Sequence, residues 1–385
     1  MRPTILVRPA FAIVALGLAA AHGARAADVT PSAAHIGVVG YATIQAAVDA
    51  AVRGDTIHVD EGVWNESVAV TFDSPADLLT IDATGAIVDG GASPAIAVNG
   101  PGVFHLVNAT FRSDATAVTA SGSDAGELSF SVDGSTITAG AGALRIDRAA
   151  VSVDVLNVFT VQGDAIVLRD CPIAYVTGFV GGAGGSGLVA ENVRALGLDS
   201  LHVDNCGGDG IRFRGDQVAM RFCDVRETGR TGIDLRFADL CEAEHNSVTG
   251  ATYRGISLAW RAGATVIVGD NVVPGGVTGI AARGGDGTIR DNRVSGAVRD
   301  GIVWRGNLTR RRVEGRPVGL VANKIVGSGR SAIRIEGSGH RVLNNEITRG
   351  DSGGVAISGG GTIAAIRANT VDGRPLAASA FPPRD

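Results

Sequence analysis

Apolar and polar residues alternate in short runs along most of the chain, and glycine-rich turns separate the runs. The clearest run reads Gly-Ile-x-Leu, and we call its Ile or Leu the anchor. Most anchors follow one another at 22 to 24 residues. One phrase repeated with a period near 22 predicts stacked coils. The anchors are Leu144, Ile166, Leu188, Ile211, Ile233, Ile256, Ile280, Ile302, Ile333 and Ile357.

A second phrase, Asn-x-(Val/Ile)-x, predicts a turn that recurs in each coil of the C-terminal half. Asparagine tolerates left-handed turn geometry, and a stacked side-chain amide can bond to the coils before and after it. A strand is predicted just before each asparagine and another about eight residues before most anchors. With the anchor strand, this gives three strands per coil and about 14 coils between Ile57 and Gly373. The repeated asparagines are Asn246, Asn271, Asn292, Asn323, Asn345 and Asn369.

A short amphipathic helix is predicted ahead of the coils. Thr43 can cap its start, and Ile44, Val48 and Val52 fall on one face. A strand over residues 56–59, a glycine turn and Trp64 follow.

Residues 41–70 resemble the entry cap of right-handed parallel β-helix proteins of the pectate-lyase-like superfamily. The resemblance implies an all-β, single-stranded right-handed parallel β-helix with an N-terminal capping helix, and the asparagine column agrees with it. A leucine-rich repeat has a similar period, but its leucine consensus is absent. A β-propeller would need repeats near 40 residues.

The N-terminus reads as an export signal over residues 1–26. Arg2 and Arg8 precede an apolar stretch over residues 10–21, which ends at an A-x-A cleavage site, Ala24 to Ala26. We expect a leader over 27–40, the β-helix domain over 41–373 and a flexible tail over 374–385. The expected location is secreted or periplasmic, with no integral membrane segment once the signal is removed.

The formal charge is −5, and it becomes −8 when the signal takes three arginines with it. Such a charge gives no support for nucleic-acid binding, and a monomer is expected. The four cysteines, Cys171, Cys206, Cys223 and Cys241, either form disulfides or pack as small core residues. A cluster of acidic residues that would hold calcium is not obvious, which weakens the analogy with pectate lyases. We expect no cofactor and no metal, and calcium stays an open but unsupported alternative.

The candidate site is a column of outward-facing arginines on the anchor strands. Arg214 and Arg236 should lie on neighbouring rungs about 4.8 Å apart, where their repulsion calls for an anion between them. In the polysaccharide lyases that the chain resembles, this strand lines the substrate groove. A basic insertion over 306–317 is expected to border it. The residues expected to bind an acidic polysaccharide are Arg169, Arg254, Arg283, Arg305, Arg310, Arg311 and Arg312.

Several chemistries stay open at this stage. A lyase-like β-elimination would use arginines to neutralise a uronate carboxylate. A glycoside hydrolase would need a carboxylate pair, for which Asp209 and Asp234 are the nearest candidates. An epimerase would use histidine, but His202 and His245 fall on other faces. A non-catalytic binding or structural role, or a surface network of Arg and Asp, is the remaining alternative. The candidate catalytic residues are Arg212, Arg214, Asp234, Arg236 and Asp209.

Overall fold

The computed structural model describes residues 33–36, 41–123, 128–309, 312–313, 316–349, 355–358 and 363–376. The chain forms two compact units, residues 1–202 (unit 1) and 203–385 (unit 2). Parallel strands wound into right-handed coils make up both units, with about 13 turns in the chain against the 14 expected. The count is lower because coils with long turns, such as the one holding residues 306–317, use more than 22 residues. The predicted export signal lies outside the described residues.

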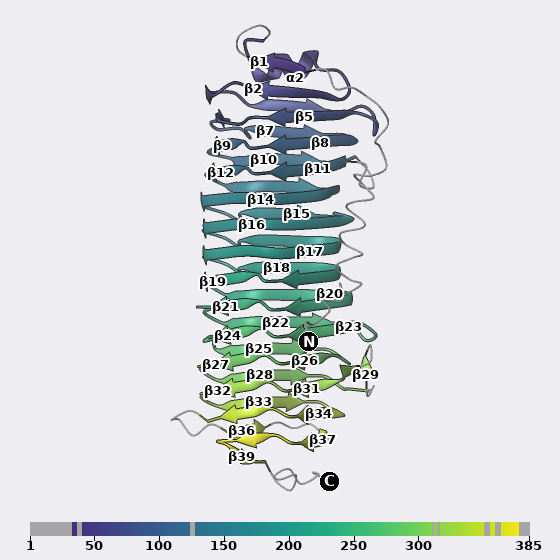
Figure 1. Ribbon diagram of the computed structural model, residues 1–385, viewed down its shortest axis with the longest axis vertical. Coiled ribbons are helices and arrows are strands. Elements are labelled where there is room, and N and C mark those ends of the chain that lie inside the picture. Colours follow the sequence, from purple (N-terminus) through teal and green to yellow (C-terminus); the bar gives the residue numbers. More distant parts are fainter. Residues whose placement is uncertain are drawn as a thin grey trace, which may run out of the picture. The chain divides into compact units, whose positions relative to one another are not determined.

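The coils after residue 250 contribute three separate strands, as the sequence predicted. In the coils between residues 142 and 249, neighbouring strands run together, as in β14 (Ala149–Val161) and β17 (Leu188–Cys206). One coil of unit 2 contains β22 (Arg254–Trp260), β23 (Thr265–Gly269) and β24 (Val272–Pro274). The next contains β25 (Thr278–Arg283), β26 (Thr288–Arg290) and β27 (Arg293–Ser295). Each strand pairs in parallel with its counterpart in the next coil (Figure 1). A coil therefore repeats both the direction and the register of the coil before it.

The anchors stack in register within each unit, which confirms the predicted alignment. In unit 1, Ile166 pairs with Leu144 on one side and Leu188 on the other. In unit 2 the anchors pair in unbroken order from Ile211 to Ile357. Every anchor is buried, with at most 3% of its surface exposed. The apolar phrase thus forms the core because strand alternation turns it inward.

Glycine precedes six of the ten anchors, whereas alanine precedes Leu144, Ile166, Ile333 and Ile357. Two glycines of unit 2 show why the residue is needed for close packing. A Cβ on Gly255 would lie 2.1 Å from Cγ1 of Val273, and one on Gly279 would lie 2.3 Å from Cγ1 of Val294. Both valines point into the same coil interior from its third strand. Any side chain at the glycine would force these strands apart, so the Gly-Ile phrase follows from the narrow cross-section of the coil.

The six repeated asparagines form a continuous asparagine ladder in unit 2. In each step, both the backbone N–H and the side-chain Nδ2 of one asparagine donate to Oδ1 of the next. Asn271 donates to Asn292 at 3.1 and 2.9 Å, and Asn292 donates to Asn323 at 3.1 and 2.9 Å. The same pattern runs through the rest of the ladder. All six are buried, with at most 1% exposed.

The left-handed geometry predicted for these asparagines belongs to their preceding neighbours instead. Positive φ angles are found at His245, Asp270, Asp291 and Asn344, each one residue ahead of a ladder asparagine. The asparagine is therefore placed by the turn and retained for its amide. That part of the prediction was wrong because the two roles fall on adjacent residues. The residue before the asparagine adopts the positive φ, and the asparagine supplies the amide.

The capping helix α2 (Ile44–Ala50) begins as predicted, with Thr43 Oγ1 accepting from the N–H of Ala46 at 3.0 Å. Its inner face differs from the prediction. Ile44 and Ala47 are buried, whereas Val52 is 64% exposed. The chain becomes extended at residue 51, so the helical period does not reach Val52. Before this helix, β1 (Ala33–Ile36), within the predicted leader, pairs in parallel with β2 (Asp55–Val59).

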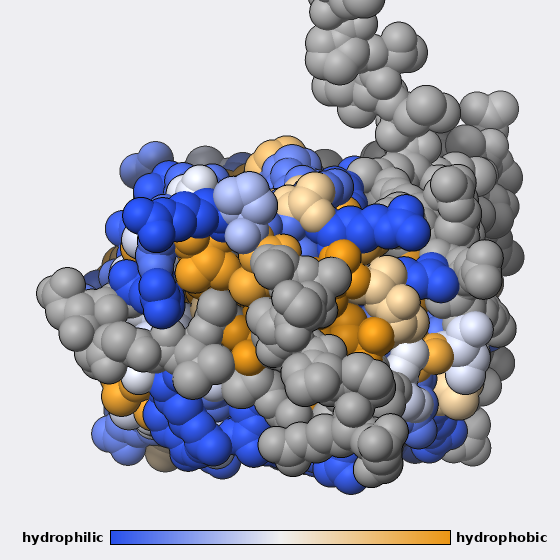
Figure 2. All heavy atoms as spheres, turned by 90° about the horizontal axis from the view of Figure 1, so that it is seen from below, coloured by the Kyte–Doolittle hydropathy of each residue, from blue (hydrophilic) through white to orange (hydrophobic). Residues whose placement is uncertain are grey.

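Apolar residues lie inside a rim of hydrophilic ones where the molecule is viewed from below (Figure 2). In β34 (His340–Leu343), Val342 is fully buried, but its partner Ile366 in β37 (Ile363–Arg367) is only half-buried. The last described coil thus leaves part of the core less covered. Within the predicted tail, β39 (Arg374–Pro375) pairs antiparallel with β38 (Thr370–Val371). The predicted domain limits remain predictions.

Candidate functional site

An arginine-rich hollow lies on the outer face of the anchor strands of unit 2. It has a volume of about 320 Å³. Its walls carry six arginines and two aspartates, a net charge of +4, although the whole chain carries −5. We call this site the arginine hollow. Its charged residues are Asp234, Arg236, Arg254, Arg283, Arg299, Asp300, Arg305 and Arg334.

Small residues make the floor of the hollow. The outward positions of β22 and β25 hold Ser257, Ala259 and Ala281, which pair with larger residues on the strands to either side. On one side is β20 (Thr231–Glu244), with Asp234 and Arg236. On the other is β28 (Asp300–Arg305), and beyond it β33 (Ser331–Glu336). Two coils of short side chains between coils of long ones thus leave a depression.

The turn before each anchor strand supplies a second wall. Residues three positions before successive anchors bond in sequence, with Val277 N–H donating to Tyr253 O and Arg299 N–H donating to Val277 O, both at 2.9 Å. This column places Tyr253 and Arg299 beside the hollow. Neither was predicted. The signal was available, because counting back three positions from each anchor selects both residues.

Charge compensation is uneven within the hollow. Arg305 Nε lies 2.8 Å and Arg334 Nη2 lies 2.7 Å from the Glu336 carboxylate. Arg236 Nε lies 3.6 Å from Asp234 on its own strand. Arg283 and Arg299 have no acidic partner within the described part of the chain. The hollow therefore has guanidinium groups available to an anion.

Tyr253 is placed against a guanidinium at the edge of the hollow. The Arg254 guanidinium carbon lies 4.7 Å from the centre of the Tyr253 ring, and Arg254 Nη2 lies 3.4 Å from its hydroxyl oxygen. Arg254 Nη1 lies 3.3 Å from Ser257 Oγ. Such stacking holds a flexible arginine in one orientation. Tyr253 itself is 51% exposed.

The structure brings five of the eleven predicted site residues of unit 2 together in the hollow. Asp234, Arg236, Arg254, Arg283 and Arg305 line the hollow. Arg212 and Arg214 lie on β18 (Ile211–Arg221), in register with Asp234 and Arg236 respectively. Arg214 and Arg236 are both exposed, so this like-charged pair stands on adjacent strands as expected.

Other predicted residues lie elsewhere. Asp209 is 6% exposed, and its Oδ1 accepts from the N–H of Thr231 at 3.0 Å, which fixes a turn. Arg169 belongs to unit 1 and lies 3.5 Å from Glu191. Arg310 and Arg311 fall outside the described residues. For Arg312 the structure gives the backbone, in β29 (Arg312–Val313), which forms a hairpin with β30 (Arg316–Pro317).

A second charged cluster in unit 2 is compensated internally. Glu242 and Glu244 are almost fully buried on the outer side of β20. Arg221 Nη2 lies 3.4 Å from Glu242, and Arg290 Nη2 lies 2.8 Å from Glu244. Arg290 also lies 2.6 Å from Asp291. Carboxylates at least match the arginines here, so the cluster does not call for an added anion.

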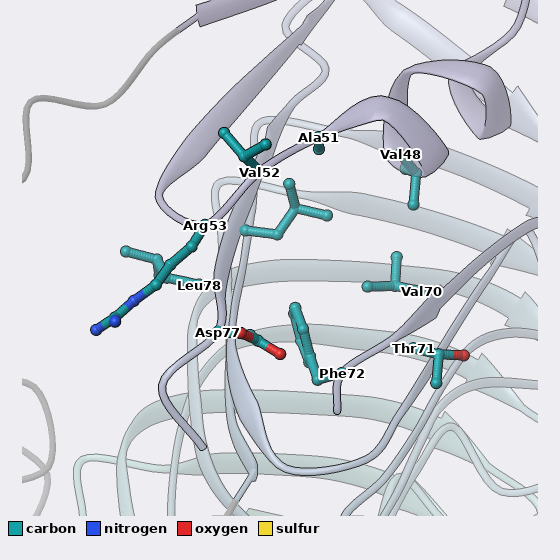
Figure 3. Close-up of a pocket in the computed structure, with 10 residues that line it drawn as sticks. Val48, Ala51, Val52, Arg53, Val70, Thr71, Phe72, Asp77 and Leu78 are labelled. Carbon is teal, nitrogen blue, oxygen red and sulfur yellow. The ribbon is translucent and has the colours of Figure 1, made fainter. Parts of the chain in front are cut away.

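A hollow in unit 1 lies beside α2 and has a volume of about 220 Å³ (Figure 3). Val48, Val70 and Phe72 line it with apolar surface. Its one carboxylate, Asp77, accepts from the N–H of Ser74 at 3.0 Å. That bond holds a turn, so this hollow shows packing of the helix on the first coils and little chemistry.

The remaining reactive side chains are withdrawn from the arginine hollow. All four cysteines are buried and none forms a disulfide, so the core alternative describes them. Burial raises the pKa of the Cys171 thiol to about 11. His202 and His245 stack on Phe179 and Phe222 with ring centres 5.1 and 5.3 Å apart. Among the residues with coordinates to describe, no group of three or more His, Cys, Asp or Glu could hold a metal ion.

The coil geometry defines a parallel β-helix protein, and its unit 2 carries an arginine-rich outer face. The chain belongs to the right-handed β-helix family, since the family model described as "Right handed beta helix region" matches residues 94–272 and 278–376. No curated protein sequence matches the chain. Within the described residues, no helix has the length and apolar content needed to cross a membrane.

Solved structures with a related fold share little sequence with this chain. The periplasmic alginate epimerase AlgG is 12% identical over 89% of this chain and 85% of its own, with a TM-score of 0.45. A mannuronic acid specific polysaccharide family 6 lyase from human gut microbiota is 12% identical over 80% and 86%, with 0.49. Tailspike protein 3 of bacteriophage CBA120 is 10% identical over 86% and 58%, also with 0.49. At these values the likeness concerns the fold alone.

Proposed function

We propose that this protein binds an acidic polysaccharide through the arginine hollow. The observation that carries the proposal is the positive charge around one depression on an acidic protein, which remains +3 when Glu336, the partner of Arg305 and Arg334, is counted with the lining residues. Guanidinium groups bind carboxylates in a bidentate fork, and such charge-assisted hydrogen bonds are stronger than neutral ones. The open, shallow shape suits a polymer that lies across the coils.

The spacing of the arginines supports a repeating ligand. Arg283 pairs in register with Arg305, and Arg214 with Arg236, so each pair lies on adjacent strands about 4.8 Å apart. Like charges at that distance repel one another. An anion between the members of a pair would replace that repulsion with attraction. A polymer with a carboxylate on every sugar offers such anions at regular intervals.

A matched pair of double variants tests the proposal. Arg283→Ala with Arg305→Ala should weaken binding of an oligouronate at least about tenfold, because two charged hydrogen-bond donors are lost. Arg226→Ala with Arg293→Ala removes the same charge from exposed arginines on β19 (Asp224–Thr228) and β27. Isothermal titration at fixed salt measures both. Equal affinities in the two double variants would contradict the assignment.

A lyase-like β-elimination is the second candidate, and the position of Tyr253 favours it. In this reaction a base removes the C5 proton, the C4–O bond breaks, and the leaving oxygen takes both the electron pair and a proton. Tyr253 lies at the edge of the hollow, where its phenolate form would take the C5 proton and the phenol so formed would give that proton to the leaving oxygen. The neighbouring arginines would stabilise the charge that develops on the carboxylate.

Turnover separates this candidate from simple binding. β-Elimination creates an unsaturated uronate, so absorbance in the ultraviolet should rise on a panel of acidic glycans. Tyr253→Phe should abolish that rise while leaving affinity within about twofold, since the ring that supports Arg254 is kept. Binding without any rise in the unmodified protein would favour a non-catalytic module.

A hydrolase fits the geometry poorly. Asp209 is used inside a turn, which leaves Asp234 and Asp300 as the carboxylates of the hollow. They lie three strands apart in one sheet and are offset by three residues, because Asp300 is in register with Thr231. Their backbones are therefore about 17 Å apart, at ~4.8 Å per strand and ~3.3 Å per residue. An inverting pair needs a carboxyl separation of roughly 6.5 to 9.5 Å.

A further inference from the structure

Asp300 is a buried carboxylate at the wall of the arginine hollow. It is 3% exposed, and it is one of the two acidic residues that line the site. Its Oδ2 lies 3.9 Å from Arg334 Nη1, which is beyond hydrogen-bond distance. Its Oδ1 is buried without a hydrogen-bond donor among the described residues. A buried charged oxygen left in this way destabilises a fold, so its presence calls for an explanation.

Aspartates at the corresponding position of other coils accept hydrogen bonds that hold a turn. Two positions before their anchors, Asp164 Oδ1 accepts from the N–H of Ser186 at 2.7 Å, and Asp209 Oδ1 accepts from the N–H of Thr231 at 3.0 Å. In the coil of Asp300, the corresponding N–H of Ser331 donates instead to the backbone oxygen of Arg299 at 3.1 Å. The turn is therefore held without Asp300, whose carboxylate keeps an unused acceptor.

An ionised carboxylate can only accept hydrogen bonds, whereas every arginine around it can only donate them. The arginines attract any polyanion and cannot distinguish one acidic polymer from another by charge alone. Asp300 repels an approaching carboxylate and attracts a hydroxyl. The wall of the hollow thus combines donors for anionic groups with one acceptor for a neutral donor.

We propose that Asp300 accepts a hydrogen bond from a sugar hydroxyl, so that the hollow selects hydroxylated polyanions over polyanions without hydroxyls. This rests on the proposed function, and it adds the residue by which the hollow would distinguish acidic sugars from other polyanions. A site with a buried polar group rejects a ligand that leaves the group unpaired, which is the usual source of such selectivity. Asp300 is here a specificity residue and takes no part in holding the coil.

The experiment compares two polymers on the full-length protein at one ionic strength. The probes are an oligogalacturonate and a poly-L-glutamate of matched charge, which carries carboxylates but no hydroxyls. The unmodified protein should prefer the oligogalacturonate by about tenfold or more. Asp300→Ala should weaken oligogalacturonate binding about tenfold and leave poly-L-glutamate binding equal or tighter, so that the preference disappears. Asp300→Asn should keep part of the preference, because its amide oxygen still accepts.

The matched control is Asp209→Ala, which removes an aspartate from the same place in another coil. It should lower the melting temperature, because Thr231 loses its acceptor, and leave the preference unchanged. If Asp300→Ala binds both polymers as the unmodified protein does, the role of Asp300 is overturned while the proposed function stands. If the unmodified protein binds neither polymer, both the proposed function and this inference are overturned.

Discussion

Units 1 and 2 wind their chains in the same way but carry different chemistry on the anchor strands. In unit 1, Arg169 pairs in register with Asp147 and Glu191, so opposite charges alternate along the column. In unit 2, Arg283 and Arg305 stand side by side. The backbone register is the same in both cases. The fold therefore places little constraint on the identity of the outward side chains. A binding face can occur on any run of coils.

The turn interiors differ as well. At the position that unit 2 fills with the asparagine ladder, unit 1 has Ala109 and Ser135, each again following a residue with positive φ. Ser135 Oγ accepts from the N–H of Ala109 at 3.2 Å, which is one bond where an asparagine step makes two. Unit 1 shows that the turn forms without asparagine. The ladder therefore adds cohesion between coils and is not required for their shape.

Breaking the ladder should give the largest effect on stability. Asn292→Ala leaves both the N–H and the Nδ2 of Asn271 without their acceptor in a buried turn. We expect a loss of about 3 kcal/mol in the free energy of unfolding, at ~1–3 kcal/mol per unsatisfied group. Ser135→Ala, which strands one N–H in unit 1, should cost about 1 kcal/mol. Urea titrations compare the two, and a cost for Asn292→Ala no larger than that for Ser135→Ala would contradict the account.

Filling the floor of the hollow should have the next largest effect. Ala281→Glu puts a carboxylate among the arginines, where it competes with the ligand, and we expect affinity for an oligouronate to fall about tenfold, equivalent to ~1.4 kcal/mol. Val167→Glu makes the same change at the corresponding outward position of unit 1. Both variants are titrated with the oligouronate. Equal losses of affinity would contradict the assignment of binding to the arginine hollow.

A smaller difference concerns acid. His340 in unit 2 is buried against Trp304, with ring centres 5.5 Å apart, whereas the core stack of unit 1, Phe104 on Phe130, cannot take up a proton. Burial lowers the pKa of His340 below its ordinary 6.5, although its bond to the Gly306 oxygen acts the other way. The unfolded chain therefore takes up this proton first, and stability present above pH 6.5 is lost as pH falls through the folded value.

His340→Gln should flatten this part of the pH dependence. Urea midpoints at pH 7.5 and pH 5, followed by tryptophan fluorescence, would show a smaller drop for the variant than for the unmodified protein. Parallel drops would show that other groups cause the acid sensitivity.

The sequence predicted the fold well because each coil of a solenoid repeats the same geometry, which produces a regular period in the sequence. Inward residues of every coil obey one alternation, and one anchor phrase sufficed to align Ile211 with Ile233 and Ile256. The same register placed Arg236 and Arg283 correctly on the outer face. It also indicated that Asp209 points inward, since it lies an even number of positions from its anchor. The assignment of Asp209 to the site conflicts with this alternation, and the structure places it in a turn.

The missed part of the site lies in turns. Arg299 precedes β28 and Asp300 is its first residue, so both lie at the turn, where hydrogen bonding decides the orientation more than strand alternation does. The hollow forms because the side chains of Ala259 and Ala281 are small. A search of the sequence for reactive residue types does not select alanine, so it does not find the hollow. The prediction for Val52 failed for a related reason. A helix of seven residues is too short for the helical period to predict which residues beyond it are buried.

The asparagine ladder has a direction. Each of the first five asparagines donates to Oδ1 of the asparagine in the coil that follows, and its Nδ2 also donates to a backbone oxygen of the coil before. The bonds of one coil's amide are therefore complete only when the next coil has formed. A chain that emerges with its N-terminus first would therefore close unit 2 one coil at a time, each finished coil waiting for its successor. Such a zipper makes the order of synthesis also the order of assembly.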